Sequence, residues 1–490
     1  MRRIPEGARK RIGLAILAAA AALFPIVVQN SGDVDAAANA CAFAILALGL
    51  NIVVGFAGLL DLGYAAFFAI GVYAYGMLAS GQITPPWHDA WQPLQWLGLV
   101  SRFHVEGAPD VVQLHFSFWL MIPGAAVVAA FFGVLYGVPT LRLKGDYLAI
   151  VTLGFGEIVP IVLTNLDEVD WIKTADGGPL NLTGGDPGIS AISPPVLPIV
   201  ARLDGSLAMF LQLLLFALVA FGLYYLIRRI IEDARAQGRP TTLTIVVGAL
   251  LGLFILYAFF YGTEIPGAGF LSLPGVAPVG HFLPTVRTPW YYLVLLIAGF
   301  SIFFIDRLRR SRLGRAWMAM REDELAASSM GIDLVRTKLL AFAMGATFSG
   351  FGGAFYGAYL GSITPSSFQF DKSVLILCMV ILGGLGNIPG VILGGLMIVS
   401  ADIFFLNRLT DLLKQIASNS NSQALADFKA SDYRLMLFGL VLVVMMAVRP
   451  EGLVPSARRK AELHASEEVA AQESVDLFDI EAKDAQLSME

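Results

Sequence analysis

Long, nearly uncharged apolar segments follow one another through most of this chain, and they constrain its fold more than any other feature. Many windows hold close to twenty such residues, the length that an α-helix needs to cross about 30 Å of hydrocarbon. Only 14% of the 490 residues are charged, and the mean hydropathy is +0.71. Because soluble domains carry about a quarter charged residues, the sequence predicts an all-α polytopic membrane protein with about 10–12 transmembrane helices.

The apolar runs and the polar punctuation between them place the candidate spans. These cover residues 12–29, 36–57, 59–79, 118–139, 147–165, 207–227, 241–262, 289–306, 338–360, 373–387, 389–406 and 433–448. The first run is similar to a signal peptide. Its length, and the lack of a small-x-small cleavage site after it, favour a retained first span.

The distribution of basic residues predicts the orientation. If the N-terminus is cytoplasmic and the spans alternate, most of the 33 Lys and Arg residues fall on the inner side, as the positive-inside rule requires. Both termini are then cytoplasmic.

The same layout predicts how the chain is divided. We expect an N-terminal cytoplasmic segment with the first span at 1–35, a transmembrane domain at 36–455, and an acidic, disordered cytoplasmic tail at 456–490. Within the transmembrane domain, we expect outer inserts at 80–117, 166–206 and 263–288 and a charged inner loop at 307–337.

The inner loop contains the stretch GRAWMAMREDELAASSMGID, Gly314 to Asp333, whose residues are mostly good helix formers. Gly331 fits a C-terminal cap of a short helix, and Asp333 fits the N-cap of the next one. An interfacial helix resting on anionic headgroups explains the basic residues of the loop but not its acidic cluster at 322–324. A docking surface for a cytoplasmic protein explains both. We expect Trp317, Met320 and Leu325 to dock, and Arg321, Glu322, Asp323 and Glu324 to lie in water or at a partner.

Several stretches carry a family resemblance. The segment SRLGRAWMAMREDELAASSMGIDLVRTKLLAFAMGATFSGFGGAFYG resembles the coupling loop and following span of bacterial ABC-importer permeases. The similarity is to the branched-chain amino acid family, specifically its LivM-type permease subunits. In chain order, GLLDLGYAAFFAIGVYAYGML, PTLRLKGDYLAIVTLGFGEIVPIVLTN, VILGGLGNIPGVILGG and YRLMLFGLVLVVMMAVRPEGLVP resemble the same family, so the similarity spans most of residues 40–455.

The resemblance implies which residues form the ATPase-coupling loop: Gly314, Arg315, Trp317, Arg321, Glu322, Asp323, Glu324, Ala326, Ala327 and Gly331. The general signature of importer permeases reads Glu-Ala-Ala, three residues, then Gly. Ala326, Ala327 and Gly331 keep this spacing, but Leu325 stands at the Glu position and Glu324 comes one residue earlier. The apolar-Leu-Pro ending of the signature is absent.

The resemblance also implies partners. It implies two cytoplasmic ABC ATPase subunits, a second, LivH-like permease subunit, an external substrate-binding protein and surrounding lipid of the bacterial cytoplasmic (inner) membrane, without nucleic acid. The chain has no G-x-x-x-x-G-K-[ST] motif. We therefore expect a transport subunit without catalytic residues or a cofactor of its own, with ATP and Mg used by the ATPase subunits.

The candidates for a translocation path lie in two spans. Asp61 and Glu157 are ionisable residues in apolar surroundings, which are functional candidates by default, although a structural acid that hydrogen-bonds within the bundle is the alternative. Gly154, Gly156 and Pro160 beside Glu157 can open the helix. A second group shares one helix face, which indicates either helix packing or a pathway: Tyr64, Phe67, Phe68, Gly71 and Tyr75.

Glycine-rich segments have their own predictions. The glycines of FSGFGGAFYGAYLG, 348–361, allow close helix contact, and GGLGNIPG, 383–390, indicates a tight hairpin rather than a nucleotide loop. LTGGDPGI, 182–189, predicts an outer turn. By resemblance, its Gly184, Gly185 and Asp186 are candidates for docking the binding protein, and an ordinary loop is the alternative.

Three function classes remain to be compared. An ABC-importer permease is the leading interpretation, and an ion-coupled secondary transporter is the second. A membrane enzyme is the third, but the five histidines lie outside the predicted spans without H-E-x-x-H spacing, so we expect no metal site. For the substrate, the resemblance implies the branched-chain amino acids leucine, isoleucine and valine, with urea or short-chain amides as alternatives within the family.

Overall fold

The computed structural model describes residues 21, 24–25, 27–28, 30–80, 100–105, 108–141, 143, 145–173, 179–195, 287–406, 408, 410, 412–415, 433–449 and 452–454. The predicted spans at 207–227 and 241–262 lie outside these ranges. So do most of the first span, most of the insert at 263–288 and the acidic tail.

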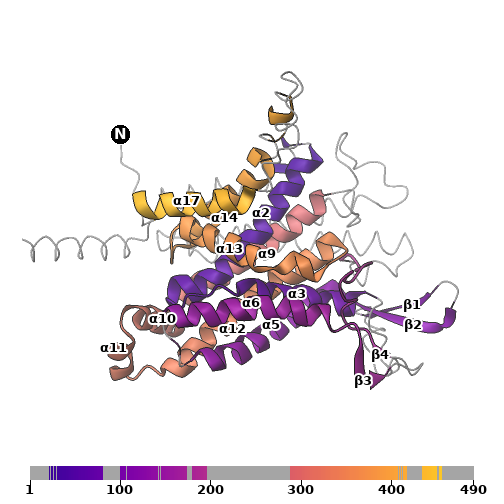
Figure 1. Ribbon diagram of the computed structural model, residues 1–490, viewed down its shortest axis with the longest axis horizontal. Helices are drawn as coiled ribbons and strands as arrows, with labels where there is room; N and C mark the ends of the chain where they lie inside the picture. Colours follow the sequence, from indigo (N-terminus) through magenta and orange to yellow (C-terminus); the bar gives the residue numbers. More distant parts are fainter. Residues whose placement is uncertain are drawn as a thin grey trace, which may run out of the picture.

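The described chain is a bundle of helices (Figure 1). Within the described residues, six segments are long and apolar enough to cross a membrane: Ser31–Phe56, Phe118–Thr140, Tyr147–Thr164, Thr288–Arg310, Leu334–Leu360 and Pro365–Gly383. Three shorter apolar helices, Tyr64–Ala79, Ile388–Ile403 and Arg434–Val448, accompany them. The predicted all-α polytopic architecture is confirmed.

The helices and strands of the described ranges follow in this order. They are α2 (Ser31–Leu50), the π-helix η1 (Asn51–Phe56), α3 (Tyr64–Ala79), β1 (Val100–Val105), β2 (Ala108–Phe116), α5 (Phe118–Thr140), α6 (Asp146–Thr164), β3 (Val169–Lys173), β4 (Pro179–Leu180), α9 (Thr288–Arg310), α10 (Arg312–Glu322), α11 (Glu324–Ser329), α12 (Leu334–Leu360), the 3₁₀-helix η5 (Pro365–Phe368), α13 (Phe370–Gly383), α14 (Ile388–Ser400), the π-helix η6 (Ala401–Leu406) and α17 (Arg434–Val448).

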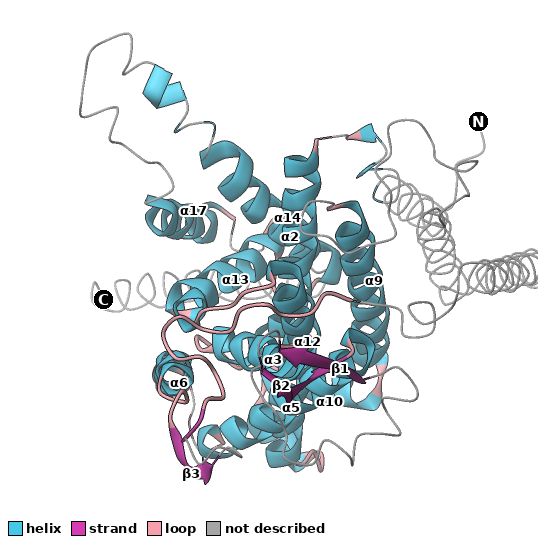
Figure 2. Ribbon diagram, turned by 90° about the vertical axis from the view of Figure 1, so that its right-hand side faces the viewer, coloured by secondary structure: helices cyan, strands magenta, loops and turns pink. Residues whose placement is uncertain are grey.

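Two antiparallel hairpins lie at one end of the bundle, and α10 and α11 lie at the opposite end (Figure 1). Val100 pairs with Phe116 in the β1–β2 hairpin, and Val169 pairs with Leu180 in β3–β4. Figure 2 looks onto the hairpin end, where β1 and β2 lie in front of α3 and α6 stands at the edge of the bundle. The two ends of the described bundle are therefore built from different kinds of structure.

The centre of the bundle is α12, which packs against α2, α3 and α5. Small residues bring the helices together: a Cβ atom on Gly71 of α3 would lie 2.8 Å from the Gly350 Cα of α12. On α5, a Cβ atom on Gly133 would lie 2.8 Å from the Ala346 Cβ. Close backbone approach of this kind holds helices together where burial from water contributes little. The predicted role of the glycines in 348–361 is confirmed.

Two membrane helices begin a few residues before the apolar runs that predicted their spans, and the second begins at the predicted cap. α2 begins at Ser31 rather than at residue 36, because the Asn30 side chain accepts a hydrogen bond from the Gly32 N–H at 3.2 Å and caps the helix. α12 begins at Leu334, because Asp333 caps it. Polar residues near both starts hide the extra turn from a search for apolar runs. The segment GGLGNIPG joins α13 to α14, which confirms the predicted hairpin.

Candidate functional site

The charged inner loop forms two short helices rather than the single predicted one. The helix is interrupted at Asp323. The Asp323 carboxylate accepts hydrogen bonds from the Leu325 and Ala326 N–H groups at 2.7 and 3.0 Å. An aspartate that satisfies the first free N–H groups of a new helix favours such a break. Good helix formers on both sides conceal it in the sequence.

The predicted caps of this loop are confirmed. Gly331 has a φ of +83°, which glycine adopts readily, and the next N–H, of Ile332, bonds to the Ala327 carbonyl at 3.1 Å. Asp333 accepts from the Arg336 N–H at 3.1 Å and begins α12. The loop therefore returns to the membrane helix over a defined turn.

α10 is docked on the bundle through its apolar side. Trp317 is fully buried, and its Nε1–H donates to the Thr337 carbonyl at 2.8 Å. Met320 is buried as well. Of the three residues expected to be available for docking, Trp317 and Met320 therefore dock on the bundle itself. Leu325 is 76% exposed, because α11 turns away after Asp323, and it stays available to a partner.

Arg321 points into the protein rather than into water as expected. Its Nη1 donates to the Gly55 carbonyl of η1 at 2.5 Å. A Cβ atom on Gly58 would lie 2.6 Å from the Arg321 Cγ, so the side chain lies directly on the backbone there. The arginine thus joins α10 to the C-terminal end of the first described span.

A third segment, the α13–α14 hairpin, meets α10 and η1 beside this hydrogen bond. The Gly386 N–H, in the α13–α14 hairpin, donates to the Oδ1 of fully buried Asn51 in η1 at 2.9 Å. A Cβ atom on Gly386 would lie 3.4 Å from the Arg321 Nη1. We call this meeting of α10, η1 and the α13–α14 hairpin, formed by Arg321, Asn51, Gly55 and Gly386, the arginine junction. π-helical turns inside α-helical segments are often found at functional sites.

The acidic residues of the loop have different surroundings. Glu324 forms an ion pair of 2.7 Å with Lys338 of α12, whose side chain is only 6% exposed. Glu322, Asp323 and Ala326 lie at the surface. Two large apolar side chains, Leu325 and Met330, are exposed by 76% and 84%. The surface at the tip of the bundle is therefore apolar with an acidic border.

The remaining coupling-loop candidates are placed as follows. A Cβ atom on Gly314 would overlap the Arg309 carbonyl. Only glycine therefore fits in the first turn of α10, next to the end of α9. Arg315 is exposed, and its Nη1 donates to the Arg310 carbonyl at 2.8 Å. Ala327 is buried.

The pathway candidates on α3 and in the segment just before it lie in the packed interior. Asp61 and four aromatic side chains are at most 1% exposed: Tyr64, Phe67, Phe68 and Tyr75. The Tyr64 hydroxyl donates to the Gly345 carbonyl at 2.9 Å, and an Asp61 oxygen accepts from the Gly63 N–H at 2.9 Å. In this conformation the side of α3 that bears these residues packs against other helices, and its Gly71 lies close to the Gly350 backbone of α12. Its part in a pathway stays a prediction.

Glu157 has a different position, because it is exposed on the outer side of α6. The opposite side of α6 is fixed to the segment that precedes α3. The Leu62 N–H donates to the Thr152 Oγ1 at 3.0 Å, and a Cβ atom on Gly156 would lie 3.0 Å from the Gly63 Cα. Pro160 stands inside an unbroken helix, so the predicted opening of α6 is not present in this conformation.

At the hairpin end, LTGGDPGI forms the predicted turn. The Gly184 N–H donates to the Asn181 Oδ1 at 2.7 Å, Gly185 is buried beside Asp167, and Asp186 is exposed. Ile189 pairs with Ile363 through backbone hydrogen bonds of 2.9 Å, which holds the turn on the connection after α12.

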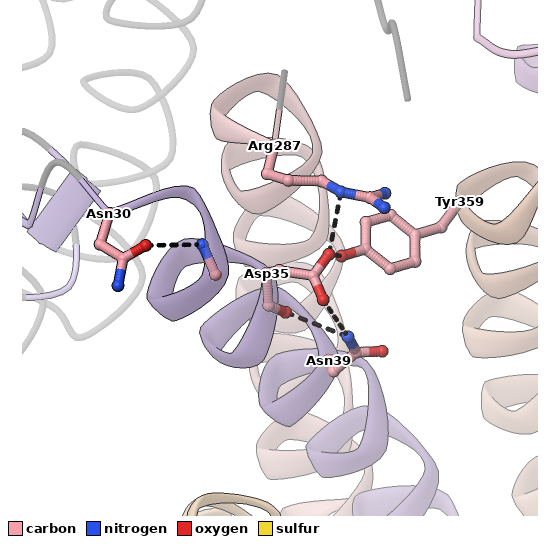
Figure 3. Close-up of polar contacts among 6 residues, drawn as sticks. Asn30, Asp35, Asn39, Arg287 and Tyr359 are labelled. Carbon is pink, nitrogen blue, oxygen red and sulfur yellow. Dashed lines mark hydrogen bonds and ion pairs between the residues drawn. The ribbon is translucent and has the colours of Figure 1, made fainter. Parts of the chain in front are cut away.

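A polar network at this end was missed by sequence reasoning. Arg287 at the start of α9 forms a 2.9 Å ion pair with Asp35 of α2, and the Tyr359 hydroxyl of α12 donates to the same carboxylate (Figure 3). The guanidinium carbon lies 4.8 Å from the centre of the Tyr359 ring. Asn39 completes the network. Only the fold brings these three helices together, so spacing along the chain gives no signal for it.

Within the part of the chain that the structure describes, no group of three or more His, Cys, Asp or Glu side chains is placed to hold a metal ion.

Comparison with known proteins gives consistent matches. The family model described as the permease component of branched-chain amino acid transport systems matches residues 34–229 and 203–446. The high-affinity branched-chain amino acid transport permease LivM of Salmonella typhimurium is 32% identical over 93% of this chain and 77% of its own length. LivM of Escherichia coli K12 is 33% identical over the same shares. LivH of S. typhimurium is 33% identical over 26% of this chain and 40% of its own length. No solved structure gives a significant match.

Proposed function

The chain belongs to the family of permease components of branched-chain amino acid transport systems, and from this membership we propose that it carries leucine, isoleucine and valine inward across the cytoplasmic membrane. It is a membrane-embedded transport subunit, and separate ATPase subunits supply the energy. The LivM proteins to which it is similar are named for branched-chain amino acid transport.

The observation that carries the proposal is the geometry of α10 and α11. Trp317 anchors α10 in the bundle, Arg321 bonds it to η1, and α11 presents exposed Leu325 and Met330 at the tip. The α10–α11 element is fixed to the bundle on one side and exposes apolar side chains on the other. It is therefore suited to receive force from a partner protein and to pass it to the bundle. We propose that the two ATPase subunits contact this tip when they close on ATP and Mg.

The main contact with the ATPase is proposed to be apolar. Glu324 is held by Lys338 within the chain. Leu325, at the position where the general signature has Glu, is 76% exposed. A docked leucine excludes water over a larger apolar area than a carboxylate does. The acidic border of Glu322 and Asp323 then orients the partner.

The proposal fixes an orientation. The α10–α11 end and both termini are cytoplasmic, and the hairpin end faces outward, in agreement with the basic residues of the inner loop. A substrate-loaded binding protein docks at the outer end, with the exposed Asp186 and its neighbours Gly184 and Gly185 as the contact. A LivH-like permease completes the pore, and the path is bordered by α3 and α6.

Uptake of labelled leucine tests the proposal. The chain is expressed with its neighbouring transporter subunits in a host deleted for its own branched-chain importers. We expect uptake that unlabelled valine and isoleucine compete away and that urea does not. Transport of urea or a short-chain amide instead of leucine would retain the permease and overturn its substrate.

The same assay tests the contact with the ATPase. Replacement of Glu322 and Asp323 by lysine should lower uptake while the chain stays in the membrane. A variant with Arg312→Gln, at the exposed start of α10, is the control for a change of charge elsewhere in the loop. Undiminished uptake by the lysine variant would show that the acidic border takes no part in coupling.

A further inference from the structure

Glu157 is the charged residue that lies deepest within a described span. It stands about 15 Å along α6 from Tyr147, where the candidate span begins, which places it near the middle of the bilayer. Charged residues of the other described spans, such as Asp306 and Lys338, lie close to helix ends. A charge at this depth is unfavourable against lipid tails and marks a pathway or a polar partner.

The direction in which Glu157 points is fixed by the packing of α6. Thr152 and Gly156 lie on the buried side, held against Leu62 and Gly63 at backbone distance. Rotation of the helix would break both contacts. The exposed position of Glu157 on the other side is therefore a property of the fold rather than of a mobile helix.

The surroundings of Glu157 are apolar and partly open. Ile150 and Ile158 are 64% and 54% exposed on the same side of α6. Gly154, one turn before Glu157, has nothing within 4 Å of the place where a Cβ atom would stand. Within the described ranges, no hydrogen bond or ion pair joins the Glu157 carboxylate to another residue. The face thus combines one unsatisfied carboxylate, branched aliphatic side chains and a notch.

A lipid-facing surface of this bundle has a different composition. On α17, the strongly exposed side chains are all apolar, among them Met436, Leu440 and Val443 at 63%, 58% and 62%. Such a face needs no explanation beyond contact with acyl chains. The carboxylate on α6 needs a cationic or hydrogen-bonding counterpart.

We propose that Glu157 binds the ammonium group of the transported amino acid as it crosses the membrane, while Ile150, Gly154 and Ile158 form an apolar wall for its branched side chain. The inference rests on the proposed function and adds a selective element to the path. Charge complementarity carries it: an amino acid brings an ammonium group to the carboxylate, and urea or an amide brings none. The binding protein and this carboxylate would then select for the same feature in succession.

The test uses the complete transporter in proteoliposomes, with leucine uptake and ATP hydrolysis measured side by side. For Glu157→Gln we expect leucine uptake to fall about tenfold or more, because a charge-assisted bond is lost. ATP hydrolysis stimulated by the loaded binding protein should be retained. Leucine uptake by Glu157→Asp should lie between that of Glu157→Gln and that of the wild type. Met436→Gln, exposed on the lipid-facing side of α17, is the control for a polar substitution and should transport as the wild type does.

A second measurement covers variants that assemble poorly. In Glu157→Cys, a positively charged methanethiosulfonate reagent should label the new thiol from water, and leucine during turnover should slow the labelling. The wild type, with Cys41 and Cys378, is the blank. Full leucine uptake by Glu157→Gln, or an introduced thiol that the water-borne reagent does not reach, would overturn the inference and leave the proposed function intact. A wild-type complex that carries urea and no leucine would overturn both.

Discussion

The Arg321 guanidinium donates to the Gly55 carbonyl at 2.5 Å, which joins α10 directly to the π-helix at the C-terminal end of the first described span. The bond links the tip that bears Leu325 to the helices of the bundle. Through Asn51 and Gly386 the junction also reaches the α13–α14 hairpin. α10 is therefore joined to η1, and through Asn51 to the α13–α14 hairpin, at one place.

Removal of the Arg321 side chain should uncouple transport from ATP hydrolysis. In Arg321→Ala, we expect leucine uptake per ATP hydrolysed to fall by about tenfold, because a hydrogen bond from a charged donor contributes about 1.5–3 kcal/mol and its loss leaves the Gly55 carbonyl without it. The measurement is the ratio of uptake to hydrolysis in the assembled complex. Arg312→Ala, at an exposed position of the same helix, should keep the wild-type ratio.

A purely structural role of Arg321 predicts something else. Uptake and hydrolysis would then fall together, in proportion to the amount of folded complex, and the ratio would not change.

A charge at the tip should block docking of the ATPase. We expect Leu325→Asp to reduce copurification of the ATPase subunits strongly. Docking would bury the apolar surface of the exposed leucine, and an aspartate has no such surface to bury. The permease itself should unfold at the wild-type temperature, since the side chain makes little contact within the chain. Ser328→Asp, which adds the same charge on α11, separates the effect of charge from that of the lost leucine. Equal copurification of Leu325→Asp and wild type would contradict an apolar contact.

Adding a methyl group should change the stability of the bundle at one helix glycine, Gly71, and not at another, Gly439. Gly71→Ala should destabilise the bundle by about 1–3 kcal/mol, because its Cβ atom meets the Gly350 backbone at 2.8 Å and the helices must separate. Gly439→Ala in α17 meets nothing within 4 Å and should leave stability unchanged or raise it. Thermal unfolding in detergent compares the two. Equal midpoints would show that α3 and α12 are not in close contact.

His115 should make the hairpin end sensitive to acid. Burial lowers the pKa of His115 below its ordinary value, and its Nδ1 lies 2.5 Å from the Ser193 Oγ. The unfolded chain therefore binds this proton more readily than the folded chain does. It follows that His115 lowers stability as the pH falls below about 6.5 and has no such effect above neutrality.

Unfolding temperatures between pH 8 and pH 5 measure this effect. The decrease in acid should be smaller in His115→Gln than in the wild type. Ser193→Ala, which removes the partner and keeps the imidazole, should retain the decrease. The same slope in His115→Gln and the wild type would assign the acid sensitivity to other groups.

The spans and caps could be predicted because their causes are local. An apolar run of sufficient length places a membrane helix wherever it occurs, and Asp333 caps α12 through its own neighbours. The family resemblance likewise lies in continuous stretches. The sequence predicted the loop and its docking residues Trp317 and Met320 for this reason.

What could not be predicted depends on contacts between distant segments. Arg321 is charged and stands in a polar stretch, which predicts a place in water or at a partner. The carbonyl that accepts its bond lies in a span 266 residues earlier. Asp35, Arg287 and Tyr359 meet only because the starts of α2 and α9 lie beside the end of α12 (Figure 3). The opposite exposure of Asp61 and Glu157 also follows from packing, because both are acids among glycines in similar apolar surroundings.

Leucine accumulation in proteoliposomes tests the central claim most directly. The complete complex is reconstituted with ATP and Mg²⁺ on the side of α10 and α11 and with the loaded binding protein on the other side. The account predicts that labelled leucine accumulates only when both are present, and that it stops when the ATPase subunits are made unable to hydrolyse ATP. Accumulation that an ion gradient drives without ATP would contradict it.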